Sequence, residues 1–231
     1  MSSRGTETRE KLVDTALRLF RDDGFQSTTM RRIASEAGVS LGNAYYYFAS
    51  KDELVHELYL AVQRDHREWA LPLLREGGSL AENLKAVLHS GLDVMTPYHD
   101  FGGTFLQSAL PTNSKSSPFS VESTDARAMA IDLMREAMTA SHQRILPSLE
   151  KQLPTLLWLA YMGVTLHWVT DSSPGQARTR ALVDGLAPVV AKAVKLARLP
   201  VARSLVGDVA RLMSTATAHQ AETAREEETV Q

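Results

Sequence analysis

Apolar residues recur at helical spacing along almost the whole chain, and this period limits the folds that the sequence can adopt. Stripes of apolar residues three and four positions apart cover the ranges 6–23, 28–37, 40–48, 50–75, 80–95, 126–138, 155–171 and 174–196. Glycine and proline separate these stripes, for example at Gly24, Gly77 and Pro97. We find no alternation of apolar and polar residues of the kind that a strand requires. The sequence therefore predicts an all-α fold.

Residues 28–48 predict two short helices joined by a tight turn. Thr28 or Thr29 can cap the first helix, because a threonine hydroxyl accepts a hydrogen bond from an N–H of the first turn. Gly38 permits the chain to reverse, since glycine tolerates a positive φ. Ser40 can then cap the second helix. Such a helix-turn-helix can place its second helix in the major groove of DNA.

The segment from Thr28 to Lys51 resembles the N-terminal region of the tetracycline-repressor (TetR) family. Ala16–Phe20 and Gly24-Phe25 match the family's first helix and its turn, and Asp52–Leu54 match the start of its fourth helix. The specific match covers roughly residues 1–60, and beyond them only the helical pattern and the length agree. The resemblance implies a homodimeric regulator, usually a repressor, that binds a palindromic double-stranded DNA operator and is released by a small molecule.

The resemblance also implies which residues contact DNA. The family contacts phosphates at the positions of Thr29 and Lys51, and it approaches bases at those of Arg31, Leu41, Gly42 and Asn43. Its aromatic cluster, which packs the short helix and reaches phosphates, corresponds to Tyr45, Tyr46 and Tyr47. These residue types suit the roles. Arginine can offer two parallel donors to guanine, asparagine can pair with adenine, and a tyrosine hydroxyl can donate to a phosphate.

The resemblance and the helical spacing together indicate how two groups of this motif are oriented. Arg31 and Arg32 cannot both point squarely at DNA, and the motif position favours Arg31. Tyr45 shares the apolar stripe of the short helix, so we expect it to be at least partly core. Tyr46 and Tyr47 fall off that stripe, and we expect them to face a partner.

The charge of the chain limits how it would bind DNA. The formal net charge is −2, from 25 Lys+Arg and 27 Asp+Glu, but residues 1–51 hold eight basic and six acidic side chains. This modest excess predicts a moderate contribution from phosphate neutralisation. Leu41 and Gly42 also offer few hydrogen bonds to bases. We therefore expect apolar contact with thymine methyl groups, or recognition of DNA shape.

The remaining sequence suggests two further parts. We expect a DNA-binding domain at residues 1–60, a helical ligand-binding and dimerisation domain at 61–200, and a C-terminal helix with an acidic, disordered tail at 201–231. In the family, the last two long helices usually pair with their symmetry mates in a four-helix interface. The candidate dimer residues are Leu159, Met162, Leu166, Leu182, Leu186 and Val189. The alternative is that these residues only fill the core of one subunit.

Aromatic and flexible side chains of the central helices form a candidate ligand pocket. They are Trp69, Met95, Tyr98, Phe101, Phe105, Met129, Leu133, Trp158 and Tyr161. Such a set can line an apolar cavity, and it can equally be a packed core. Few charged residues interrupt these faces, so we expect an apolar or aromatic effector of unknown identity.

Other kinds of chemistry have less support. The chain has no cysteine, its histidines lack metal-ligand spacing, and we expect neither a cofactor nor an enzyme. Residues 38–42 fit the G-x-S-x-G pattern of hydrolases, but that pattern requires a preceding strand and a sheet. The alternatives are a helical small-molecule-binding protein or enzyme with an incidental helix-turn-helix, or a protein-interaction module.

Residues 152–170 carry no charged side chain and could be interpreted as a membrane span. The stretch contains Pro154 and His167 and lacks flanking basic clusters, so we interpret it as a helix buried on most sides. No targeting segment is visible, and we expect a cytoplasmic protein without a membrane partner.

Overall fold

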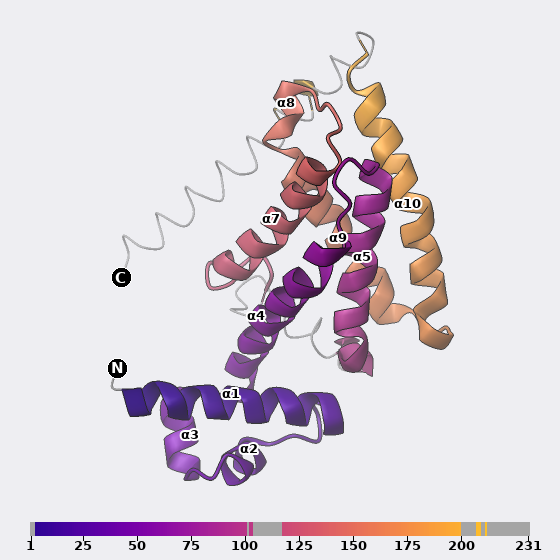
Figure 1. The fold of residues 1–231 in the computed structure, drawn as a ribbon. Helices are drawn as coiled ribbons and strands as arrows, with labels where there is room; N and C mark the ends of the chain where they lie inside the picture. The colour runs from indigo at the N-terminus through magenta and orange to yellow at the C-terminus, as the bar shows by residue number, and fades with distance from the viewer. Residues whose placement is uncertain (1–2, 101, 104–116, 200–206, 209–210, 212–231) are drawn as a thin grey trace. The chain divides into compact units, whose positions relative to one another are not determined.

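A computed structural model describes residues 3–100, 102–103, 117–199, 207–208 and 211. Every regular element in these ranges is a helix, which confirms the all-α prediction (Figure 1). The α-helices are α1 (Ser3–Asp23), α2 (Met30–Glu36), α3 (Leu41–Tyr47), α4 (Lys51–Ala70), α5 (Leu80–Met95), α7 (Thr124–Ala140), α8 (Pro147–Glu150), α9 (Leu153–Thr170) and α10 (Ala177–Leu196). Short 3-10 turns are η1 (Leu71–Leu73), η2 (Thr96–Tyr98) and η3 (Pro174–Gln176).

The chain forms two compact units. The first comprises residues 1–67 and 91–129, and the second comprises residues 68–90 and 130–231. Both units are discontinuous in sequence, because α4, α5 and α7 each run from one unit into the other. The domain boundary that we expected after residue 60 falls inside α4, which continues to Ala70. Most of the expected tail at 201–231 lies outside the described residues.

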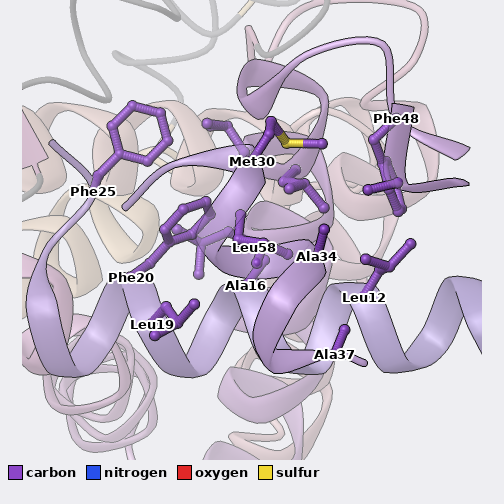
Figure 2. Close-up of a cluster of buried hydrophobic side chains, with 14 of the residues drawn as sticks. Leu12, Ala16, Leu19, Phe20, Phe25, Met30, Ala34, Ala37, Phe48 and Leu58 are labelled. Carbon is purple, nitrogen blue, oxygen red and sulfur yellow. The ribbon is translucent and has the colours of Figure 1, made fainter. Parts of the chain in front are cut away.

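The core of the first unit forms where α1 lies across α2 and α3 (Figure 1). One face of α1 is apolar at every third or fourth position, and this face is buried. Its side chains meet those of α2, α3 and α4 in a single cluster, and the labelled members are Leu12, Ala16, Leu19, Phe20, Phe25, Met30, Ala34, Ala37, Phe48 and Leu58 (Figure 2). Burial of each large apolar side chain contributes about 1.5–3 kcal/mol, so this cluster holds the short helices in place.

Two predicted pocket residues pack against the same cluster. Met95, at the end of α5, and Tyr98, in η2, are half-buried against it. Burial also raises the pKa of the Tyr98 hydroxyl. For these two residues, the packing agrees with the alternative that the predicted pocket residues form a packed core. Phe101 and Phe105 lie outside the described residues.

The start of α10 differs from the prediction. The apolar pattern predicts a helix from residue 174, but α10 begins at Ala177. Gly175 and Gln176 adopt φ values of 61° and 52°, which end the short turn η3 and exclude a continuous helix. Two side chains cap the first turn of α10. The Ser173 hydroxyl accepts a hydrogen bond from the Arg178 N–H at 3.2 Å, and the buried carboxylate of Asp171 accepts from the Thr179 N–H and hydroxyl at 2.8 Å each.

Helix α9 and its N-cap residue, Gln152, contain the uncharged stretch of the sequence. Its buried residues are Leu153, Pro154, Leu157, Trp158, Tyr161, Val164 and Trp168. In the part of the chain that the structure describes, we find no helix with both the length and the apolar character needed to cross a membrane. The interpretation as a helix buried on most sides therefore agrees with the burial of α9.

Candidate DNA-binding site

Side-chain caps define the two short helices of the motif. The Thr29 hydroxyl accepts a hydrogen bond from the Arg32 N–H at 3.2 Å, and so caps α2. The Ser40 hydroxyl accepts from the Asn43 N–H at 3.1 Å, and so caps α3. Both capping residues have extended backbone angles, as an N-cap requires. Of the two candidate caps for α2, the structure selects Thr29.

The turn between α2 and α3 has the predicted geometry. Gly38 has a φ of +68°, a conformation that glycine adopts without steric cost. Its N–H donates to the Ser35 carbonyl at 3.1 Å, and the Val39 N–H donates to the Ala34 carbonyl at 2.9 Å. A helix precedes Ser40, so the residues at 38–42 do not form a hydrolase nucleophile elbow.

One face of α3 and the start of α2 are exposed together. The exposed predicted DNA-contact residues are Thr29, Arg31, Gly42, Asn43, Tyr45 and Tyr46. Tyr46 is 79% exposed, and its ring lies edge-on to that of Tyr47 with centroids 5.1 Å apart. A side-chain carbon added at Gly42 would meet no atom within 4 Å, so the backbone of α3 is open to a partner there.

The orientation of the tyrosines corrects one expectation. Tyr47 is half-buried against the core cluster, whereas Tyr45 is 49% exposed. The buried direction of α3 is set by Ala44 and Phe48. With 100° per residue, Tyr45 and Tyr47 each lie about 80° from that direction, on opposite sides. The sequence period therefore could not decide which of them packs inward.

The two adjacent arginines have different surroundings. Arg32 forms ion pairs with Asp23 at 2.9 Å and with Glu36 at 3.3 Å. Glu36 also pairs with Arg18, and this bond is the main cause of the lowered pKa of the Glu36 carboxyl. Arg31 is exposed and makes no ion pair with any described residue. This difference agrees with the choice of Arg31 as the residue that faces DNA.

The remaining predicted DNA-contact residues, Leu41 and Lys51, make contacts within the first unit. Leu41 is half-buried and packs against the core cluster. Lys51 is half-buried at the start of α4, and its ammonium group donates to two carbonyl groups of the loop that precedes α2. Both residues therefore have a structural role in addition to any contact with DNA.

The predicted dimer residues lie on α9 and α10 of the second unit. Leu159, Leu166, Leu182 and Val189 are exposed, and Met162 and Leu186 are half-buried. Val189 is 62% exposed. Sequence reasoning missed exposed Leu196, although Leu182, Val189 and Leu196 repeat every seven residues.

The predicted pocket residues of the second unit are mostly core. Leu133, Trp158 and Tyr161 are almost fully buried, whereas Trp69 is 58% exposed and does not fit an enclosed pocket. Met129, at the end of the first unit, is half-buried. A small apolar hollow, with room for about one water molecule, occurs in the second unit and is lined by Leu84, Leu88, Met134, Leu157, Ala160, Tyr161, Leu186, Ala187 and Val190. Of the predicted pocket residues, Tyr161 lines it.

Two family models match the chain. Residues 12–58 match the model described as "Bacterial regulatory proteins, tetR family". Residues 83–212 match the model described as "Tetracyclin repressor-like, C-terminal domain". The second match alone extends over more than half of the chain, and the first contains all of α2 and α3.

Curated relatives match different shares of the chain. The transcriptional regulator BetI of Agrobacterium fabrum is 40% identical over 91 residues, which are 38% of this chain and 44% of BetI. The nicotine-responsive repressor HdnoR of Paenarthrobacter nicotinovorans is 34% identical over 92 residues, or 38% of this chain and 43% of HdnoR. The matches thus span less than half the length of these relatives. The repressor KstR2 of Mycobacterium tuberculosis is 26% identical over 72% of this chain and 83% of its own length.

Solved structures share the fold. A tetR-family regulator from Streptomyces coelicolor superposes with a TM-score of 0.60 and 19% identity, over 95% of this chain and 98% of that chain. The repressor FadR of Thermus thermophilus, solved in complex with lauroyl-CoA, superposes with a TM-score of 0.55 and 23% identity, over 78% and 92% of the two chains. At these identities the likeness shows the arrangement of helices.

Proposed function

This chain belongs to the tetracycline-repressor family, and from that premise we propose that it is a dimeric, sequence-specific DNA-binding repressor that a small, largely apolar molecule releases from its operator. The observation that carries the proposal is the exposed face of the capped helix-turn-helix. Asn43, Tyr45 and Tyr46 project from α3 while Ala44 and Phe48 fix the helix from behind. A rigid helix with an exposed polar and aromatic face suits insertion into the major groove.

We assign roles to the side chains by their exposure and chemistry. Arg31 and Asn43 are exposed and can read guanine and adenine through paired hydrogen bonds. Thr29, Tyr45 and Tyr46 offer hydroxyl groups to phosphates. Leu41 and Gly42 offer no side-chain hydrogen bond to base edges, which supports thymine methyl contact and recognition of DNA shape at the start of α3.

The proposed dimer forms through α9 and α10. Leu159 and Leu166 of α9 and Leu182 and Val189 of α10 expose apolar surface within one unit, on helices that contact each other. A self-complementary interface would bury these side chains in both subunits at once. Two subunits would present two α3 helices, so the operator should contain two inverted half-sites. Their centres are expected one helical turn of DNA apart, about 34–36 Å, or a multiple of it.

The proposed effector is apolar in its main part. The hollow of the second unit has only apolar residues and Tyr161 in its lining, and it must widen to bind an effector, because its volume is about that of one water molecule. The structure of the Thermus thermophilus relative contains lauroyl-CoA, which makes acyl-CoA a reasonable first probe for this chain. Release of DNA by lauroyl-CoA, but not by coenzyme A alone, would support an apolar effector. Equal release by coenzyme A alone would contradict it.

The proposed function is tested by selecting DNA from a random library with the purified protein. We expect enrichment of an inverted repeat, protection of both half-sites in a footprint, and binding that weakens as salt rises. Failure to enrich any sequence would refute the proposal. The family consists of regulatory proteins, so an enzyme with an incidental helix-turn-helix is the weaker alternative. That alternative predicts no salt-dependent affinity for DNA.

A further inference from the structure

Lys51 is held by the protein itself, at the first position of α4. Its Nζ donates to the Phe25 carbonyl at 2.7 Å and to the Thr28 carbonyl at 3.0 Å. The same nitrogen lies 3.9 Å from the centroid of the Phe25 ring, within the range of a cation–π contact. An ammonium group has three N–H donors. Two of them are therefore committed to the backbone of one loop.

That loop, residues 24–29, sets the start of α2. Thr28 is fully buried, and its hydroxyl donates to the Gly24 carbonyl at 2.8 Å. The next residue, Thr29, is the cap of α2. A loop carbonyl held by Lys51 thus lies directly before the cap that orients Arg31 and the rest of α2.

The ammonium group of Lys51 lies at the N-terminus of α4, where a positive charge needs compensation. A cation at a helix N-terminus faces the positive end of the helix dipole, which disfavours it there. The two carbonyl oxygens and the ring face of Phe25 supply the negative potential that offsets this effect. Lys51 is also half-buried, unlike exposed Arg31.

We propose that Lys51 is a positioning residue, which holds the α1–α2 loop and thereby orients α2 on DNA. Its ammonium group contacts this loop and not a DNA phosphate. The inference rests on the proposed DNA-binding function. It replaces the phosphate contact that the family resemblance implies for this position.

The first test needs no DNA. Hydrogen exchange of the loop and the first turn of α2, residues 24–33, is compared in the wild type, Lys51→Met and Lys51→Arg. The positioning role predicts faster exchange in both variants, because neither a thioether nor a planar guanidinium reproduces the ammonium between two carbonyls and a ring. Wild-type exchange in both variants, with unchanged melting temperature, would overturn the proposal.

The second test measures affinity for the selected operator against salt concentration. For Lys51→Met we expect a loss of about tenfold, the scale of one charge-assisted hydrogen bond, with the wild-type slope of log K against log salt. Loss of one phosphate contact in each subunit would instead flatten the slope by about 1.8. Such flattening, or wild-type affinity in Lys51→Arg, would contradict the positioning role. If the wild type itself lacks DNA affinity, the proposed function fails, while the exchange experiment still decides the role of Lys51.

Discussion

The helix pair α2–α3 and the helix pair α9–α10 are built in different ways. In the first, each helix carries its own cap within three residues, Thr29 for α2 and Ser40 for α3. In the second, α10 begins where Asp171 reaches across eight positions to Thr179, and α9 is apolar around most of its circumference. The first pair is defined by local bonds and presents polar groups outward. The second is defined by packing and leaves apolar side chains exposed, which suits a partner surface.

The largest expected effect comes from placing a charge on the α9–α10 surface. Leu166→Glu would bury an uncompensated carboxylate in each subunit of the proposed dimer, at a cost of about 3–5 kcal/mol. We expect the dimer dissociation constant to rise at least about 100-fold, measured by analytical ultracentrifugation. Operator affinity should fall with it, since one monomer reaches only one half-site.

The matched control is Phe119→Glu, because Phe119 is also an exposed apolar residue but lies in the first unit. We expect this variant to remain dimeric. A Leu166→Glu protein that stays dimeric at low concentration would show that α9 does not contribute to the interface.

The adjacent arginines give the next largest effect. Arg31→Ala should weaken operator binding by about 30-fold or more, since one arginine–base contact is lost in each of two subunits at about 1–3 kcal/mol apiece. Arg32→Ala should have a smaller effect, because Arg32 is already paired with Asp23 and Glu36. Fluorescence anisotropy with labelled operator measures both. The reverse order of the two losses would show that the sequence-based choice of Arg31 is wrong.

Alanine substitutions at two glycines of the motif should change the stability of the protein in opposite directions. Gly38→Ala places a side chain at φ +68° and should destabilise the protein by about 1–2 kcal/mol. Gly42→Ala should instead raise stability by up to about 1 kcal/mol, because Gly42 lies within α3 with open space around it. Urea unfolding measures both. If the Gly42→Ala variant is more stable than the wild type but binds the operator less tightly, the backbone of α3 lies close to DNA at this position.

The smallest effect concerns the start of α10. The Ser173 hydroxyl, followed by further hydrogen bonds from Ser173 and Thr179, holds the pKa of the Asp171 carboxyl well below its ordinary value. Asp171→Asn should lower the melting temperature by a few degrees, because an amide has one acceptor oxygen instead of two. The lowered pKa means that this stabilisation is present above the ordinary pKa of about 3.9 and is lost as pH falls. The difference between wild type and variant should therefore be constant from about pH 5 to 8 and shrink below about pH 4. A difference that grows in acid would contradict this role.

The sequence predicted the fold class and the helix-turn-helix closely, and the C-terminal face less completely. Most expected helices occur within a few residues of their predicted ends, because their caps and stops are local. The start of α10 was misplaced, since the positive φ of Gln176 is not visible in the sequence. Trp69 was grouped with pocket residues on its chemistry alone, yet it is exposed.

The motif at residues 28–51 and the helical character of the remaining chain follow from the sequence alone. Both depend on interactions within three or four residues, such as Ser40 with Asn43. The tertiary structure decided which of Tyr45 and Tyr47 packs inward, which leucines of α9 stay exposed, and that the ammonium of Lys51 faces a loop far from it in sequence. A helical sequence contains the residues of every face of the helix. Which of those faces becomes buried depends on the elements that pack against it.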